Sequence, residues 1–138
     1  MAAATMQVEL VSPERVLFTG EATMVITRTL GGGDIAFMPG HAPFLAALTE
    51  CHTKITLAEG GVLDVAVHGG FVQVDGTKVS ILSDLAELSD QIDVERARVA
   101  LGRAEEALVH EHDAEVEASL RRAHARINAA GGLGTRQH

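Results

Sequence analysis

The period of the apolar residues changes near residue 90, and this change constrains the fold most. Before it, apolar residues recur at every second position, as in a strand with one buried face. After it, they recur at intervals of three and four, the period of an amphipathic helix. Asp93 stands where the helical period begins, and a carboxylate there can accept hydrogen bonds from the free amides of the first turn. The sequence therefore predicts a β domain followed by a helical domain, with Asp93 as the first N-cap.

Short apolar segments fill the first 89 residues, and glycine-rich or proline-rich turns separate them. The pair Asp75-Gly76 is a strong hairpin signal, and the three glycines from Gly31 to Gly33 favour another turn. Strands are predicted at residues 6–11, 16–18, 22–30, 35–38, 44–48, 53–57, 62–68, 71–74 and 78–82. Many short strands at this spacing predict a β-sandwich or a flattened barrel.

Two helices joined by a short polar turn are predicted after Asp93. The first runs to about Val109, and the second begins after Asp113, so the two form an antiparallel hairpin. Their apolar seams contain Val94, Ala97, Leu101, Ala104 and Leu108, and then Val116, Leu120, Ala123 and Ile127. Small side chains bury little area, so we expect a hairpin that is only marginally stable by itself. The predicted domains are residues 1–89 and 90–131, with a disordered tail at 132–138.

Composition excludes several classes of function. The net charge of −8 argues against nucleic acid and anionic lipid, because both require a basic surface. A single cysteine, Cys51, excludes an internal disulfide and fits a reducing compartment. We expect no signal peptide and no membrane span, so any link to a membrane would come through a partner. Phosphate-loop, serine-elbow and paired-cysteine motifs are absent, so neither catalytic nor metal-binding residues are predicted.

Two histidine motifs each have a structural and a chemical interpretation. His110 and His112 lack the i, i+4 spacing that places two imidazoles on one helical face, so a solvated turn is preferred to a metal site. His41 could act as a general base, but no acid or nucleophile accompanies it in sequence. We therefore prefer a histidine that fixes a loop or contacts a partner.

Arginines gather in the helical part of the chain. Arg122 and Arg126 are one helical turn apart, and Arg96 follows the Asp93 cap. One interpretation is an exposed face with weak surface ion pairs. The other is an anion site, in which three guanidinium groups and a helix N-terminus hold a polyphosphate.

An ordered set of motifs over about residues 6–130 resembles the epsilon subunit of bacterial F-type ATP synthases. The most specific are the Pro-Gly-His-Ala-Pro loop that contains His41 and the later Gly-Gly-Phe that ends at Phe71. The others are Val11-Ser12-Pro13-Glu14, Leu17-Phe18-Thr19-Gly20-Glu21-Ala22, Val79-Ser80-Ile81-Leu82-Ser83-Asp84 and Ile92-Asp93-Val94-Glu95-Arg96-Ala97.

The resemblance implies a fold and a non-catalytic function. The fold is an N-terminal ten-stranded β-sandwich followed by a C-terminal antiparallel two-helix hairpin. The function is that of a central-stalk rotor subunit, whose sandwich binds the gamma subunit and the ring of c subunits. The hairpin either folds on the sandwich or extends toward the catalytic alpha and beta subunits and inhibits ATP hydrolysis. Such a subunit is peripheral, on the cytoplasmic face of the bacterial cell membrane.

The resemblance also implies two sets of site residues. Asp34 matches the acidic position that contacts the c-ring, close to the loop that carries His41. Some members bind ATP on the folded hairpin. In these members ATP is a regulatory ligand and not a required cofactor. The matching residues here are Glu87, Ile92, Asp93, Arg96, Ala97, Arg122 and Arg126.

Two other functions are compatible with parts of the sequence. In the first, the chain is a free-standing regulatory module whose β-sandwich is a scaffold for a ligand. Co-purification with a gamma-type partner separates that module from a rotor subunit. In the second, the chain is a small hydrolase that uses His41, for which the sequence offers no nucleophile.

Overall fold

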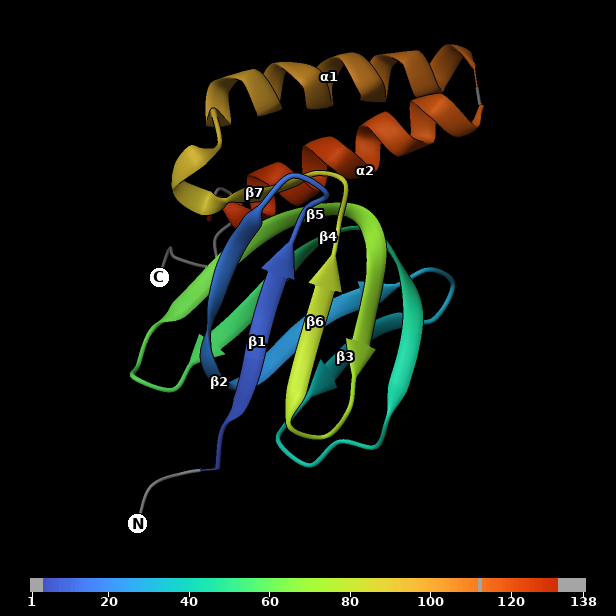
Figure 1. The fold of residues 1–138 in the computed structure, drawn as a ribbon. Coiled ribbons are helices and arrows are strands. Elements are labelled where there is room, and N and C mark those ends of the chain that lie inside the picture. The colour runs from blue at the N-terminus through green and yellow to red at the C-terminus, as the bar shows by residue number, and fades with distance from the viewer. Residues whose placement is uncertain (1–3, 112, 132–138) are drawn as a thin grey trace.

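A computed structural model describes residues 4–111 and 113–131 of the 138-residue chain. In it, a β domain is followed by a short 3-10 helix and two α-helices that lie against one side of that domain (Figure 1). The strands are β1 (Met6–Val11), β2 (Val16–Thr29), β3 (Gly33–Phe37), β4 (Phe44–Leu57), β5 (Val62–Val74), β6 (Lys78–Leu82) and β7 (Ala86–Leu88). The helices are η1 (Ser89–Gln91), α1 (Val94–His110) and α2 (Ala114–Ala129). The predicted disordered tail lies outside the described residues.

The strands form one sheet that closes on itself. Its order is β1-β6-β5-β4-β2-β3, and β1 also pairs with β2, so five strands complete a ring. The β1–β6 pair is parallel, and all the other pairs are antiparallel. Strand β3 extends the ring at one edge, and β7 pairs with the first half of β5. This closed and flattened sheet confirms the predicted β-sandwich or barrel.

The described residues form seven strands, and the expectation of ten is wrong. Segments that alternate in different phases were predicted as separate strands, but β2, β4 and β5 run through the interruptions. In β5 the inward residues change from Val65 and Val67 to Val72 and Val74, which shifts the alternation by one position. Gly69 and Gly70 allow this shift, because both have positive φ and a Cβ on Gly70 would collide with the carbonyl oxygen of Leu82.

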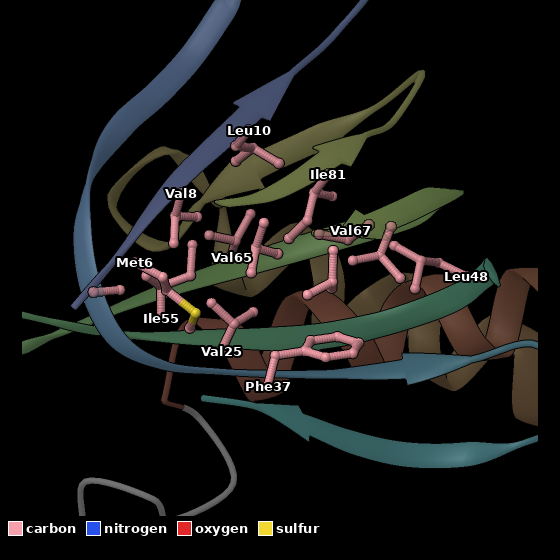
Figure 2. Close-up of a cluster of buried hydrophobic side chains, with 14 of the residues drawn as sticks. Met6, Val8, Leu10, Val25, Phe37, Leu48, Ile55, Val65, Val67 and Ile81 are labelled. Carbon is pink, nitrogen blue, oxygen red and sulfur yellow. The ribbon is translucent and has the colours of Figure 1, made fainter. Parts of the chain in front are cut away.

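The interior of the sheet is a core of aliphatic side chains (Figure 2). Alternate residues of β1 and β6, such as Val8 and Ile81, point into it from one side. Val25, Phe37 and Ile55 fill the other part of the core and are inaccessible to solvent. This dense core makes the sheet a rigid platform on which the helices can dock.

The helical hairpin docks through its second helix. Helix α1 packs on α2, and α2 lies on β4 and β5 (Figure 1). The contact with the sheet consists of small side chains: Ala125 and Ala129 of α2 pack on Ala66 of β5. Both predicted N-caps are confirmed, because Asp93 accepts a hydrogen bond from the Arg96 amide and Asp113 accepts one from the Val116 amide.

Candidate ligand site between the hairpin and the sheet

A cavity of about 480 Å³ opens where η1, α1, α2 and β7 meet. Its volume is within the range of small-molecule sites. The sequence predicted five of the residues that line it, and these are Glu87, Asp93, Arg96, Ala97 and Arg126. They come from three elements and the link before α1, so the cavity forms only when the hairpin lies on the sheet.

The first turns of α1 bring positive charge to the cavity. The Asp93 carboxylate accepts from the Arg96 amide at 3.1 Å and thereby fixes the first turn of the helix. Arg103 follows Arg96 by about two turns, so both line the same cavity. Within the described part of the chain, neither guanidinium group has a carboxylate partner.

Arg126 enters the cavity from α2 and is held by Glu87 of β7. The Arg126 Nε atom donates to Glu87 Oε1 at 2.7 Å, and the same oxygen lies 3.0 Å from Nε2 of His68. Burial alone would raise the pKa of Glu87, but the hydrogen bonds from Arg126 and His68 outweigh burial and lower it. Glu87 is therefore ionised at neutral pH.

His68 lies under the site on β5, and its side chain is 3% exposed. Burial lowers its pKa most, the nearby charges of Arg126 and Arg122 lower it further, and Glu87 only partly opposes them. The imidazole is therefore neutral at pH 7. Because a carboxylate can only accept, the Nε2 atom carries the proton and donates to Glu87.

Two predicted residues lie beside the cavity rather than in its lining. Ile92 packs on the small-residue contact between α2 and β5. The Arg122 Nη2 atom donates to Glu115 and to Ser119, each at 2.9 Å, so this arginine is engaged within its own helix.

The arrangement favours an anionic ligand with an apolar portion. Arg96, Arg103 and Arg126 oppose only Asp93 and Glu87, whereas the whole chain has a net charge of −8. The lining also includes Val99 and Ala100, which offer an apolar surface. Guanidinium groups bind phosphate oxygens in bidentate geometry, so a phosphate ester fits this chemistry.

Comparison with known proteins identifies the family. Residues 5–89 match the model described as ATP synthase, Delta/Epsilon chain, beta-sandwich domain, and residues 90–131 match the long alpha-helix domain of that chain. This chain belongs to the ATP synthase delta/epsilon chain family. It is thus a non-catalytic subunit of an F-type ATP synthase.

Similar proteins include bacterial epsilon chains. The ATP synthase epsilon chain of Streptomyces griseus is 46% identical, over 92% of this chain and 96% of that protein. That of Thermobifida fusca is 50% identical, over 89% of this chain and 90% of that protein. A chain in the Euglena gracilis mitochondrial ATP synthase shares the fold with a TM-score of 0.72 at 19% identity, covering 100% of this chain and 84% of that one.

Four residues of the cavity were missed from the sequence: Gln91, Val99, Ala100 and Arg103. Arg103 had a detectable signal, because it stands seven positions after Arg96 on the same helix. Gln91 had none, because its place depends on η1, where its side chain accepts a hydrogen bond from the Leu88 amide at 3.0 Å.

The two residues predicted to contact the c-ring, Asp34 and His41, lie away from the cavity. Asp34, on β3, is paired with Arg28 at 2.8 Å, and this arginine lowers the pKa of Asp34. The His41 ring packs edge-on against Phe37 at 5.0 Å, and its Nδ1 atom lies 2.8 Å from the Ala42 carbonyl oxygen. These contacts agree with a loop-fixing role, and the alternative of a contact with a partner stays a prediction. No helix of the described chain is long and apolar enough to span a membrane.

Proposed function

We propose that this subunit belongs to the central stalk of a bacterial ATP synthase and that its hairpin regulates ATP hydrolysis. The observation that supports regulation most is the cavity, because both the hairpin and the sheet contribute to it. A ligand that binds there favours the docked hairpin by its difference in affinity between the docked and open forms. ATP is the proposed ligand, and its triphosphate would face Arg96, Arg103 and Arg126.

Calorimetric titration of the intact chain with Mg-ATP tests this ligand. We expect saturable heat and a rise in melting temperature with ATP concentration. Replacing Arg96 or Arg126 with alanine should weaken binding by about tenfold or more, because each variant loses a charge-assisted contact.

Arg98→Ala is the matched control, because Arg98 lies on the same helix outside the cavity and pairs with Glu95 at 3.5 Å. Its affinity should equal that of the unmodified chain. No heat and no melting shift at millimolar ATP would reject the nucleotide site.

A row of apolar side chains on the outer face of the sheet supports docking to a stalk partner. Val16 and Leu82 both pair with Val11, and Leu82 also pairs with Phe71. Phe71 is 54% exposed, although it is one of only four aromatic residues in the chain. An exposed apolar patch that crosses several strands is typical of a protein interface. We assign this row to the gamma-type subunit.

Co-purification tests the assignment. A Phe71→Ser, Leu82→Ser double variant should lose most of its association with the gamma-type subunit and remain folded. Val109→Ser is the control, because Val109 is 76% exposed on the hairpin and outside this row. Undiminished recovery of the stalk partner by the double variant would reject the assignment.

The contact with the c-ring is proposed for Asp34, near the start of β3, and for the loop of His41 that follows β3. Two observations support this proposal. Asp34 matches the acidic position of the family, and the His41 ring packs against Phe37 in the loop. Asp34→Ala should weaken proton-coupled ATP synthesis in reconstituted vesicles, whereas Glu59→Ala, in the exposed turn between β4 and β5, should not. Unchanged coupling in Asp34→Ala would reject this contact.

Inhibition requires the hairpin to leave the sheet and reach the alpha and beta subunits. Its small contact with the sheet supports this opening, because Ala66, Ala125 and Ala129 bury little area. Removal of residues 91–138 from the assembled complex should raise ATP hydrolysis, and an unchanged rate would contradict inhibition. In the cell the subunit is proposed to lie on the cytoplasmic face of the membrane, held there by the complex.

A further inference from the structure

Arg126 is held by one edge of its guanidinium group. Its Nε atom donates to Glu87 Oε1 at 2.7 Å. Within residues 4–111 and 113–131, its two Nη nitrogens have neither a hydrogen bond nor an ion pair. A guanidinium group fixed in this way presents its remaining donors in a defined plane, which suits a phosphate group. The orientation of Arg126 therefore depends on the Glu87 carboxylate.

Glu87 depends in turn on a buried histidine. The His68 Nε2 atom lies 3.0 Å from Glu87 Oε1, the oxygen that also accepts from Arg126. The His68 side chain is 3% exposed, and its Nδ1 atom is buried with no partner in the described part of the chain. A neutral imidazole that donates only through Nε2 explains both observations, because its Nδ1 atom then carries no proton that needs an acceptor.

We infer that His68 is a positioning residue of the nucleotide site: it holds Glu87, and Glu87 holds Arg126 with its free edge available to a triphosphate. The inference rests on the proposed binding of ATP. His68 touches no ligand in this arrangement, so its effect passes through the two side chains between it and the cavity. The three residues come from β5, β7 and α2, so the series is complete only in the docked form.

The surroundings keep the imidazole neutral. Glu87 faces it from β7, Arg122 and Arg126 face it from α2, and Glu50 is its cross-strand neighbour on β4. Glu50 is paired with Arg121 at 2.8 Å and is therefore neutralised. Protonation of His68 would place an N–H without an acceptor in a buried site beside two arginines. The Nε2 atom of His68 therefore keeps its proton and donates to Glu87 at neutral and alkaline pH.

Two replacements of His68 separate a positioning role from simple packing. In His68→Gln, the amide nitrogen can occupy the place of Nε2 and donate to Glu87, whereas His68→Leu fills a similar volume without a donor. Calorimetry with Mg-ATP at pH 8 should give an affinity roughly tenfold weaker for the leucine variant. The glutamine variant should remain within about twofold of the unmodified chain, as expected when one hydrogen bond is kept. Nitrogen-15 NMR of the unmodified protein should show a proton on Nε2 of His68 and none on Nδ1.

His52 provides the matched control. Its Nε2 atom also contacts a carboxylate, Asp64, at 2.7 Å, but neither residue lines the cavity. His52→Leu should therefore leave ATP affinity unchanged. If His68→Leu does not fold, His68→Asn replaces it, because the shorter amide cannot reach Glu87.

The outcomes distinguish a failure of the positioning role of His68 from a failure of the proposed ATP site. If the unmodified chain binds no ATP, both fail. If it binds ATP and the variant without a donor binds equally well, the positioning role alone fails. Equal weakening in the glutamine and leucine variants would also reject the role, because it would indicate lost packing rather than a lost donor.

Discussion

The sheet interior and the contact between the hairpin and the sheet use different interactions. The interior is built from large aliphatic side chains and Phe37, which solvent does not reach. The contact with α2 contains alanines and two ion pairs that bridge the domains, Arg121–Glu50 and Arg126–Glu87. The interior therefore depends on apolar burial, whereas the contact between the hairpin and the sheet is weaker and also depends on charge.

This difference matches the two roles that we propose for the subunit. A stalk component must hold its shape under load, and a dense apolar core provides that rigidity. A regulatory element must change its position at low energetic cost, and a contact made of small side chains and partly exposed ion pairs allows this. The predictions below test each side of the comparison, from the largest expected effect to the smallest.

Truncation in the sheet interior should have the largest effect. Phe37→Ala leaves a cavity in a fully buried part of the core, so we expect a loss of about 3–5 kcal/mol in the free energy of unfolding. Denaturant titration followed by circular dichroism measures it. Phe71→Ala is the control, because the half-exposed ring should contribute far less. Similar losses in the two variants would contradict the description of the core.

Overpacking the contact between the hairpin and the sheet should have a moderate effect. Ala125 is 2% exposed between α2 and the sheet, so Ala125→Leu should weaken docking by about 1–3 kcal/mol. Hydrogen exchange should then become faster in α2 and remain slow in β5. The control is Ala114→Leu, at the exposed start of α2. Faster exchange throughout the sheet would mean that the two regions form one cooperative unit.

Removal of the hairpin should have a smaller effect on the sheet. Without residues 91–138, we expect a folded β domain whose melting temperature falls by only a few degrees, on the order of 1 kcal/mol for a domain of this size. Circular dichroism and NMR dispersion of the fragment measure this. Collapse of the fragment would reject the division of the chain near residue 90.

Acid should weaken the ion pairs of the contact by a small amount. Burial would raise the pKa of Glu50, but hydrogen bonds from Arg121 and Thr49 outweigh burial and lower it, as similar bonds lower that of Glu87. A carboxylate whose pKa is lower in the native than in the unfolded state stabilises the fold at pH values above its unfolded pKa, about 4.3 for Glu. This contribution is lost as the pH falls through the native pKa.

The double variant Glu50→Gln, Glu87→Gln should therefore show a shallower loss of stability below about pH 5 than the unmodified chain. Thermal melts at a series of pH values measure this. Glu59→Gln, in an exposed turn, should leave the pH profile unchanged. Identical profiles for the double variant and the unmodified chain would show that these pairs contribute nothing.

Helical features were predictable because their determinants are local. Asp93 and Asp113 were identified as N-caps from their place before an apolar period, and the structure confirms both. The seams were only partly predictable: Ala97, Ala104, Ala123 and Ile127 are buried, whereas Leu101 and Leu120 remain partly exposed.

Strand number was not predictable, because period-2 patterns fail where a strand turns. In β4 the inward residues change from Leu48 to Cys51 and Thr53, at the level where β5 changes phase. A sequence pattern cannot distinguish such a bend from a turn between two strands. The position of His68 under Glu87 was equally hidden, because it depends on the pairing of β5 with β7.

The glycine pair in β5 has a mechanical consequence. Because it reverses which side of the strand faces outward, His68 lies beneath α2 while Phe71, three residues on, lies exposed in the apolar row. Only about 10 Å of strand separates the two. The proposed ligand site and the proposed gamma-binding row therefore lie on one continuous strand, on opposite sides of the glycine pair.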